Sequence, residues 1–387
     1  MKRIFISILV IVLLFSSIAF AGKPIVKIAF IGPLTGPAAF QGLGGRNAFK
    51  LALMEAKKQN LPFKLVPIIL DDQSDPTVAV NAALKVCSDK RVLVSISHWN
   101  SPCALATIDT FHRYGLATIV WGAVHPGITQ KGYKEVSRIP TPLTFQNKFA
   151  AKFLMNLGYK RFSVIYETSD YGKGHKDVFT QAIRDLGGEI VSEDGIVAGE
   201  RNFQPILTKI KAKNPDVVYY GGYSPEAALI VTQMKSVGLD AQFVGISGIS
   251  DVKFIKLAKE NAEGTIGFVD SPPMDKLPKG KEFVEKYKKA HFKEDIAPYS
   301  PHAYDATWIA IEALKRAYPE LKRKRVVEEI RNTKDYDGVL GKISFDENGQ
   351  SNIVTIVARV VQDGKWVLWE ESEYASGKRK LIPPKSK

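Results

Sequence analysis

The feature that most constrains the fold of this 387-residue chain is an alternation of short β-branched runs with longer amphipathic stretches, which begins at Lys23. Near-continuous apolar strands separated by helices are typical of a parallel sheet covered on both faces. The first part of the chain is therefore expected to form an α/β lobe. The pattern in this part predicts strands at 26–31, 63–70, 92–96 and 117–120, and helices from about 42, 76 and 101.

The same alternation restarts after Pro140, which predicts a second α/β lobe, and the length also favours two domains. Asp363-Gly364 separates two late runs and indicates a two-residue hairpin. Because later segments must be shared between two sheets, we expect the chain to cross between lobes more than once. The predicted strands are 162–166, 189–195, 217–220, 242–245, 265–269, 353–362 and 365–369, and the predicted helices are 144–157, 172–186, 203–213, 225–237, 279–291 and 301–317.

Residues 1–21 have the pattern of a secretory signal peptide. Lys2 and Arg3 precede an uncharged run that is short for a membrane span, and small residues lead to Ala21. We expect cleavage before Gly22 and a soluble protein outside the cytoplasm. The net charge of +14 includes the two leader charges. The remaining lysines are scattered, as in 281–293, so a solvated basic surface is expected and nucleic acid is not an expected partner.

The sequence offers no convincing cofactor or catalytic motif. The glycine-rich segment 42–47 lies some ten residues beyond the first strand and has Asn47 where a dinucleotide fingerprint needs its third glycine. Residues 245–249 lack the second glycine of a hydrolase elbow. His98 and His125 both follow strands, but two histidines alone make a weak zinc site, and polar lining is favoured. We therefore expect no enzyme activity, no cofactor and no metal.

Two further features of the first lobe have structural interpretations. Asp75-Pro76 reads as a helix cap with Pro at the first position, and we prefer this to an acidic cluster with Asp71 and Asp72. Cys87 and Cys103 flank a five-residue strand, which separates them by about 16 Å, beyond the ~7 Å limit for a disulfide. Two free thiols are expected.

Open α/β sheets bind ligands beyond the carboxyl ends of their strands, here between two lobes. Ser101-Pro102 directly follows a strand and starts a helix, so Ser101 is predicted to be the N-cap. A helix N-terminus and a serine hydroxyl suit a carboxylate, although an ordinary cap remains the alternative. The residues that follow the strands are 32–36, 97–101, 121–125, 167–171, 221–223 and 246–250.

Several short segments, spread over nearly the whole mature chain, carry a family resemblance. They are Ile31-Gly32-Pro33-Leu34-Thr35-Gly36-Pro37, Asp71-Asp72 with Asp75-Pro76, Ala198-Gly199-Glu200 before Phe203, Tyr219-Tyr220-Gly221-Gly222-Tyr223-Ser224-Pro225-Glu226, Ser236-Val237-Gly238-Leu239 with Gln242-Phe243, and Ala262-Glu263-Gly264. In this order and spacing they resemble the leucine/isoleucine/valine-binding proteins. The resemblance implies a type I periplasmic binding protein fold, with two doubly wound parallel-sheet lobes joined by a three-strand hinge. The expected division is 22–142 with 272–348, and 143–271 with 349–387.

The resemblance also implies a binding site. It places the ligand carboxylate on Ser101 and on backbone groups of Gly122 and Ala123, and it makes Tyr171 and Tyr223 the second-lobe residues that close over the ligand. Tyr299 aligns with a family aromatic, and Phe40 or Gln41 stands where an aromatic covers the ligand side chain. His98 and Trp99 extend the first-lobe wall, as do Trp121 and His125, with packing beneath the loops as the alternative.

Two positions depart from the family pattern. Val124 replaces a threonine that helps to hold the carboxylate, and Ser247 replaces the glutamate that pairs with the ligand ammonium. An unpaired buried ammonium would cost several kcal/mol. We therefore expect a monomeric periplasmic receptor that feeds the permease and ATPase of an ABC importer with a small carboxylate, aromatic or amide-like in character. A conventional branched-chain amino acid binder and a sensor coupled to a signalling partner are the alternatives.

Overall fold

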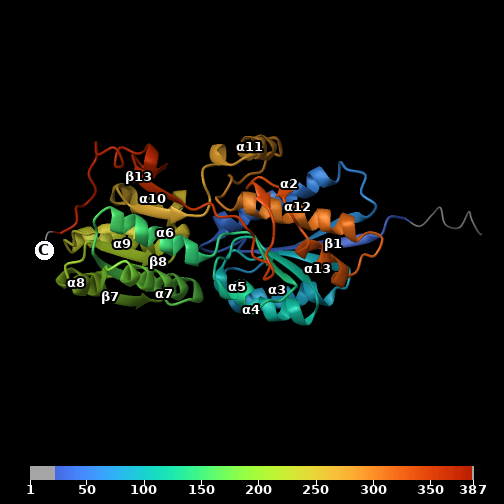
Figure 1. Cartoon of the computed structure of the whole chain (residues 1–387), viewed down its shortest axis with the longest axis horizontal. Coiled ribbons are helices and arrows are strands. Elements are labelled where there is room, and N and C mark those ends of the chain that lie inside the picture. Colours follow the sequence, from blue (N-terminus) through green and yellow to red (C-terminus); the bar gives the residue numbers. More distant parts are fainter. Residues whose placement is uncertain (1–21, 386–387) are drawn as a thin grey trace, which may run out of the picture.

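The computed structural model describes residues 22–385, so the predicted signal peptide lies outside the described part. Two α/β lobes lie side by side along the long axis of the molecule (Figure 1). Helices α12 (Ser300–Ala317) and α13 (Arg323–Arg331) lie with the N-terminal elements, whereas strand β13 (Val357–Gln362) lies in the other lobe. Each lobe is therefore built from segments far apart in the sequence. Within residues 22–385, no helix combines the length and apolar character needed to span a bilayer.

The first lobe contains a parallel five-stranded sheet in the order β2-β1-β3-β4-β5. Phe30 and Ile31 point to opposite faces, as neighbours on a strand must: Phe30 packs with α2 and α12, and Ile31 packs with α3 and α4. Both faces are thus buried, which explains the near-continuous apolar strands. The elements are β1 Ile25–Gly32, α2 Ala39–Ala56, β2 Lys64–Asp71, α3 Pro76–Ser88, β3 Val92–Ser97, α4 Ser101–Arg113, β4 Ala117–Val120, α5 Gly127–Gln130, β5 Val136–Arg138, α11 Gly280–Lys289, α12, α13, β11 Tyr336–Asp337 and β12 Lys342–Ile343.

The second lobe contains a seven-stranded sheet in the order β14-β13-β10-β9-β8-β6-β7. Five strands are parallel, and the hairpin β13–β14 joins one edge antiparallel to β10. Val164 packs with α6 and α7, and Ile165 packs with α8, α9 and α10 on the other face. The elements are α6 Leu143–Asn156, β6 Arg161–Glu167, α7 Asp170–Asp185, β7 Glu189–Ile196, α8 Gln204–Ala212, β8 Val217–Gly221, α9 Ser224–Ser236, β9 Gln242–Gly245, α10 Val252–Ala258, β10 Ile266–Val269, β13 and β14 Lys365–Leu368.

The chain passes between the lobes three times: from β5 to α6, from β10 to α11, and from β12 to β13. Hydrogen bonds tie the three crossings together. The Thr141 amide donates to Asp270 Oδ2 (3.1 Å), its hydroxyl donates to the Ile353 carbonyl (3.0 Å), and the Thr355 hydroxyl donates to the Asp270 carbonyl (2.8 Å). The expectation of repeated crossings is confirmed. The lobe boundaries proposed from the sequence stay a prediction about which residues move together.

The third crossing explains one error of the sequence analysis. The strand predicted at 353–362 begins only at Val357, because the residues before it bond to the other two crossings. Strand β5 was missed because it has three residues, and α13 was missed in a strongly charged segment.

Other local predictions are confirmed. Asp75 caps α3 and accepts from the amides of Thr77 and Val78 at 2.7 and 2.9 Å. Asp363 and Gly364 have positive φ of 52° and 69° in the β13–β14 turn, as a type I′ hairpin requires. Cys87 and Cys103 are both free and buried. The glycine-rich segment lies inside α2, where a side chain at Gly42 would meet the Pro33 carbonyl oxygen at 1.8 Å, so this glycine permits close packing.

Candidate functional site between the lobes

A cavity of about 810 Å³ lies between the lobes, at the carboxyl ends of their strands. The first lobe contributes the segments after β1, β2 and β3, and the second lobe contributes those after β6, β7, β8 and β9. The sequence analysis predicted this location. Of the predicted site residues, Phe40, Gln41, Trp99 and Tyr223 line the cavity.

Four aromatic side chains, Trp99, Tyr171, Tyr223 and Tyr299, form a cluster across the two lobes, here called the aromatic cluster. Tyr223 stacks on Tyr171, with ring centroids 4.9 Å apart and planes 12° apart, and it lies 5.6 Å from Trp99. Trp99 and Tyr299 meet edge to face at 6.2 Å. Since Trp99 and Tyr299 come from the first lobe and the other two from the second, the structure brings these predicted residues together.

Direct hydrogen bonds also join the two lobes. Asn100 Nδ2 in the first lobe donates to the Tyr223 hydroxyl at 3.3 Å, and Lys253 Nζ in the second lobe donates to the Pro37 carbonyl at 2.8 Å. Within the second lobe, the Gly248 amide donates to the Tyr171 hydroxyl at 2.9 Å. Tyr171 is thus fixed by its own lobe, while Tyr223 reaches across the cleft.

Ser101 is not the N-cap of α4, so that prediction was wrong. The cap is Asn100, whose backbone is extended (φ −82°, ψ 132°), and the helix already includes Ser101. Because a cap residue must lie outside the helical conformation, Ser101 cannot serve as one. Its hydroxyl is buried and has no hydrogen-bond partner, and its neighbours Asn100 and Pro102 line the cavity. The amides of the first helical turn also lack intrahelical partners.

The Gly122 amide, one of the predicted carboxylate ligands, already has a backbone partner. The Gly122 amide donates to the His98 carbonyl at 3.2 Å, and a side chain at Gly122 would meet Trp99 Cδ1 at 2.3 Å. Ala123 is buried with residues of α4. The Val124 carbonyl accepts from the Leu143 amide at 2.9 Å, and its side chain packs in the second-lobe core. Val124 therefore helps to join the lobes.

The Ser247 side chain is a buried hydroxyl. Its hydroxyl accepts a hydrogen bond from Gln146 Nε2, which also donates to the Phe268 carbonyl at 3.2 Å. Gln146 Oε1 is buried without a partner. Close to the hinge, Asp270 accepts from the Tyr299 hydroxyl and the Thr141 amide, and burial raises the pKa of this carboxyl to about 6.

Two carboxylates that the sequence analysis did not select, Glu167 and Glu226, line the second-lobe wall of the cavity. Burial, followed by the neighbouring charge of Glu226, raises the pKa of Glu167 to about 7. For Glu167, the sequence signal was its position at the end of β6, within the strand-end segment 167–171.

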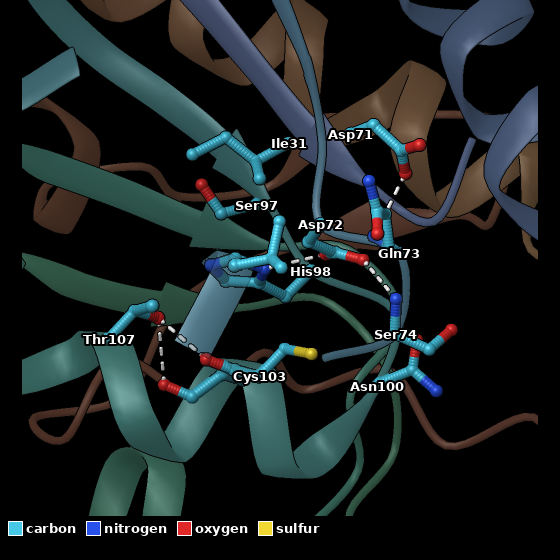
Figure 2. A network of polar contacts seen from close by, with 12 residues as sticks. Ile31, Asp71, Asp72, Gln73, Ser74, Ser97, His98, Asn100, Cys103 and Thr107 are labelled. Carbon is cyan, nitrogen blue, oxygen red and sulfur yellow. Dashed lines mark hydrogen bonds and ion pairs between the residues drawn. The ribbon is translucent and has the colours of Figure 1, made fainter. Parts of the chain in front are cut away.

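His98 is buried next to the cavity-lining Trp99 in the sequence, and Figure 2 shows its ring directed at Asp72. His98 Nδ1 lies 2.9 Å from Asp72 Oδ2, both side chains are buried, and Asp72 Oδ1 accepts from the Ser74 amide at 3.0 Å. The pair joins the segment after β2 to the segment after β3. His125 Nδ1 instead accepts from the Gly127 amide at 3.1 Å, and burial lowers its pKa. Neither histidine lines the cavity, and residues 22–385 contain no group of three or more His, Cys, Asp or Glu arranged for a metal.

Comparison with known proteins agrees with this architecture. Residues 25–365 match the family profile described as periplasmic binding protein. The chain is 32% identical over 340 residues to the Leu/Ile/Val/Thr-binding protein of Salmonella typhimurium, covering 86% of this chain and 90% of that protein. It superposes on a leucine-binding protein from Thermotoga maritima with a TM-score of 0.82 and 30% identity, covering 93% of this chain and 99% of that one.

A more distant structure shares the fold alone. This is a solute-binding protein of an ABC transporter from R. palustris, solved in complex with benzoate. Its TM-score is 0.79 at 18% identity, and the match covers 94% of this chain and 97% of that one.

Proposed function

The chain belongs to the periplasmic binding protein family, in the group of the Leu/Ile/Val-binding proteins, and from this membership we propose that it binds a small carboxylate-bearing ligand for an ABC importer. The proposed ligand is aromatic or amide-like and lies between the lobes. The names of the related proteins describe ligand binding, in keeping with a function that makes or breaks no bond. The proposed partners are a permease and an ATPase, and the proposed mature protein begins at Gly22 in the periplasm.

One observation carries the proposed carboxylate seat: the buried Ser101 hydroxyl has no partner at the N-terminus of α4. A helix N-terminus favours negative charge, because its first amides are free and its dipole is positive there. Since Asn100 and not Ser101 is the cap, the hydroxyl is not needed by the helix. It is available to donate to a ligand carboxylate, together with the helix amides.

The aromatic cluster supports a ligand with a flat or apolar body. Trp99 and Tyr223 come from opposite lobes and both line the cavity. Aromatic rings provide apolar faces with polar edges, which suits an aromatic acid or an amide. We infer that ligand binding favours the closed arrangement, in which Tyr223 reaches Asn100, and that the importer recognises this state.

The setting of Ser247 supports a ligand without an α-ammonium group. The side chain at this position is a neutral hydroxyl, and its bonded neighbour Gln146 is also neutral. Burying an ammonium without its counter-charge costs several kcal/mol. Benzoate in a distant member of the fold is an example of an ammonium-free acid held by the same architecture.

A conventional branched-chain amino acid binder is the second candidate. It is favoured by relatives at 30–32% identity, whose names specify leucine, isoleucine, valine or threonine. In that case the ammonium partner has to be a carboxylate other than residue 247. A sensor that passes closure to a signalling partner shares the same ligand chemistry, and in vivo uptake assays would separate it from an importer.

Isothermal titration calorimetry on the mature protein tests the proposal. Benzoate and phenylacetate should bind, whereas leucine, isoleucine and valine should bind no tighter than about 0.1 mM, because their ammonium groups would be unpaired. Micromolar binding of any of the three amino acids, with no binding of the two acids, would establish the second candidate instead.

A further inference from the structure

The lining of the cavity is acidic, mainly on its second-lobe side, although the whole protein is basic. The charged residues that line the cavity are five acids and one base: Asp75, Glu167, Glu200, Glu226, Asp251 and Arg201. The protein as a whole carries a net charge of +14. The charge of the cavity lining is therefore opposite in sign to the net charge of the protein.

Several of these acids have structural partners. Asp75 caps α3, and Asp251 caps α10 by accepting from the Phe254 amide at 3.0 Å. Glu226 Oε1 accepts from the Gly199 amide at 2.9 Å. Their positions are accounted for by the fold, at least in part.

Glu167 differs from the others in one carboxylate oxygen, although Ser169 is a hydrogen-bonding neighbour of the carboxylate. Its side chain is 8% exposed, and its Oε2 atom is buried with no hydrogen-bond partner. Across residues 22–385, no Lys, Arg or His nitrogen lies within 4.0 Å of the Glu167 or Glu226 carboxylates. A buried acceptor without a partner is costly, and a second carboxylate nearby increases that cost.

Burial and the charge of Glu226 raise the pKa of Glu167 to about 7, which agrees with this unfavourable environment. A hydrogen-bond donor on the ligand would satisfy Oε2, and a positive charge on that donor would also offset the two carboxylates. The cavity, at about 810 Å³, is within the range of roughly 300–1,000 Å³ that holds drug-sized ligands. Glu167 lines the same cavity as Asn100 and Pro102, the neighbours of Ser101.

We propose that Glu167, with Glu226 beside it, recognises a nitrogen-borne hydrogen-bond donor at the end of the ligand remote from its carboxylate. An amine, an amidine or an amide would serve. The inference rests on the proposed function, since it takes the first-lobe seat at Ser101 as the place of the carboxylate. It narrows the ligand to a molecule with an acid at one end and a nitrogen donor at the other.

Three probes that share one ring test the inference by calorimetry on the mature protein. Benzoate carries only the acid, benzylamine carries only the amine, and 4-(aminomethyl)benzoate carries both. The doubly substituted probe should bind about tenfold or more tightly than benzoate, because a charge-assisted hydrogen bond is added. In Glu167→Gln this preference should fall to about twofold or less, while benzoate affinity is retained.

The matched control is Glu193→Gln, which makes the same chemical change on β7 of the same lobe, where Glu193 pairs with Arg184 outside the cavity. It should leave the preference unchanged. Melting temperatures of both variants, measured without probe, establish that each is folded.

The outcomes separate this inference from the proposed function. Equal binding of benzoate and 4-(aminomethyl)benzoate, or no binding of either amine probe at 1 mM, would overturn the role of Glu167 and leave the acid seat intact wherever benzoate binds. Glu167-dependent binding of benzylamine without benzoate binding would support the donor site and refute the acid seat. Glu167-dependent binding of leucine would overturn the remote position of the donor.

Discussion

Replacing Ser101 by alanine should weaken carboxylate binding without destabilising the free protein. A hydrogen bond to a charged group contributes about 1.5–3 kcal/mol, so the dissociation constant of benzoate should rise roughly 10- to 150-fold. The free protein should be unaffected, because the Ser101 hydroxyl has no partner and Asn100 occupies the cap position. Removing a buried hydroxyl that bonds to nothing is nearly neutral or slightly stabilising.

Calorimetry with benzoate and thermal melts without ligand measure the two effects separately. Ser163→Ala is the matched control, because Ser163 is also a buried serine but accepts a hydrogen bond from the Ser192 hydroxyl at 3.0 Å, away from the cavity. It should lose about 1 kcal/mol, lowering the melting temperature by roughly 1–2 °C, and keep its affinity. A Ser101→Ala variant with a lowered melting temperature and unchanged benzoate affinity would refute the reasoning.

Three further predictions follow from buried groups. Cys87 and Cys103 should both be alkylated after denaturation without reductant, and neither should react in the native protein. Both thiols are buried, and burial raises the pKa of Cys87 to about 11. An intact disulfide bond found by mass spectrometry would contradict this prediction. Ser247→Glu should weaken benzoate binding about tenfold or more by calorimetry, because it places an unmatched charge beside Gln146, and unchanged affinity would count against the neutral site. Burial raises the pKa of Glu167 from 4.5 to about 7, so between these pH values the folded state keeps a proton that the unfolded state releases. The stability of the wild type relative to Glu167→Gln should therefore fall as the pH rises from about 4.5 to 7. Urea-denaturation midpoints of the two proteins that change in parallel across this range would refute the prediction.

Local sequence patterns were sufficient for most of the fold. In a doubly wound sheet the strands are buried on both faces and each helix on one face, so the apolar pattern of both is visible in the sequence. Asp75 before Pro76 and Asp363 before Gly364 gave a helix start and a hairpin turn correctly, because caps and tight turns depend on a few adjacent residues. The position of the cavity also followed, since parallel sheets place their strand ends at one edge.

The sequence was less informative where contacts join distant residues. The strand predicted at 353–362 was shortened by bonds to Thr141 and Asp270, which lie more than 80 residues away in the chain. Ser101 was misassigned as a cap by one residue, because the same Ser-Pro pair fits either the cap or the first helical position until the backbone angles are known.

Tertiary structure decided the chemistry of the cavity. The sequence shows that residue 247 is an uncharged serine. Its hydrogen bond with Gln146, 101 residues earlier, depends on how α6 packs against the second sheet. Glu167 is one of many glutamates in the sequence, and only the fold buries it near Glu226 and leaves its Oε2 atom without a hydrogen-bond partner. A side chain's type is fixed by the sequence, whereas its solvation and its partners depend on which distant segments surround it, and these determine the energy of a buried charge.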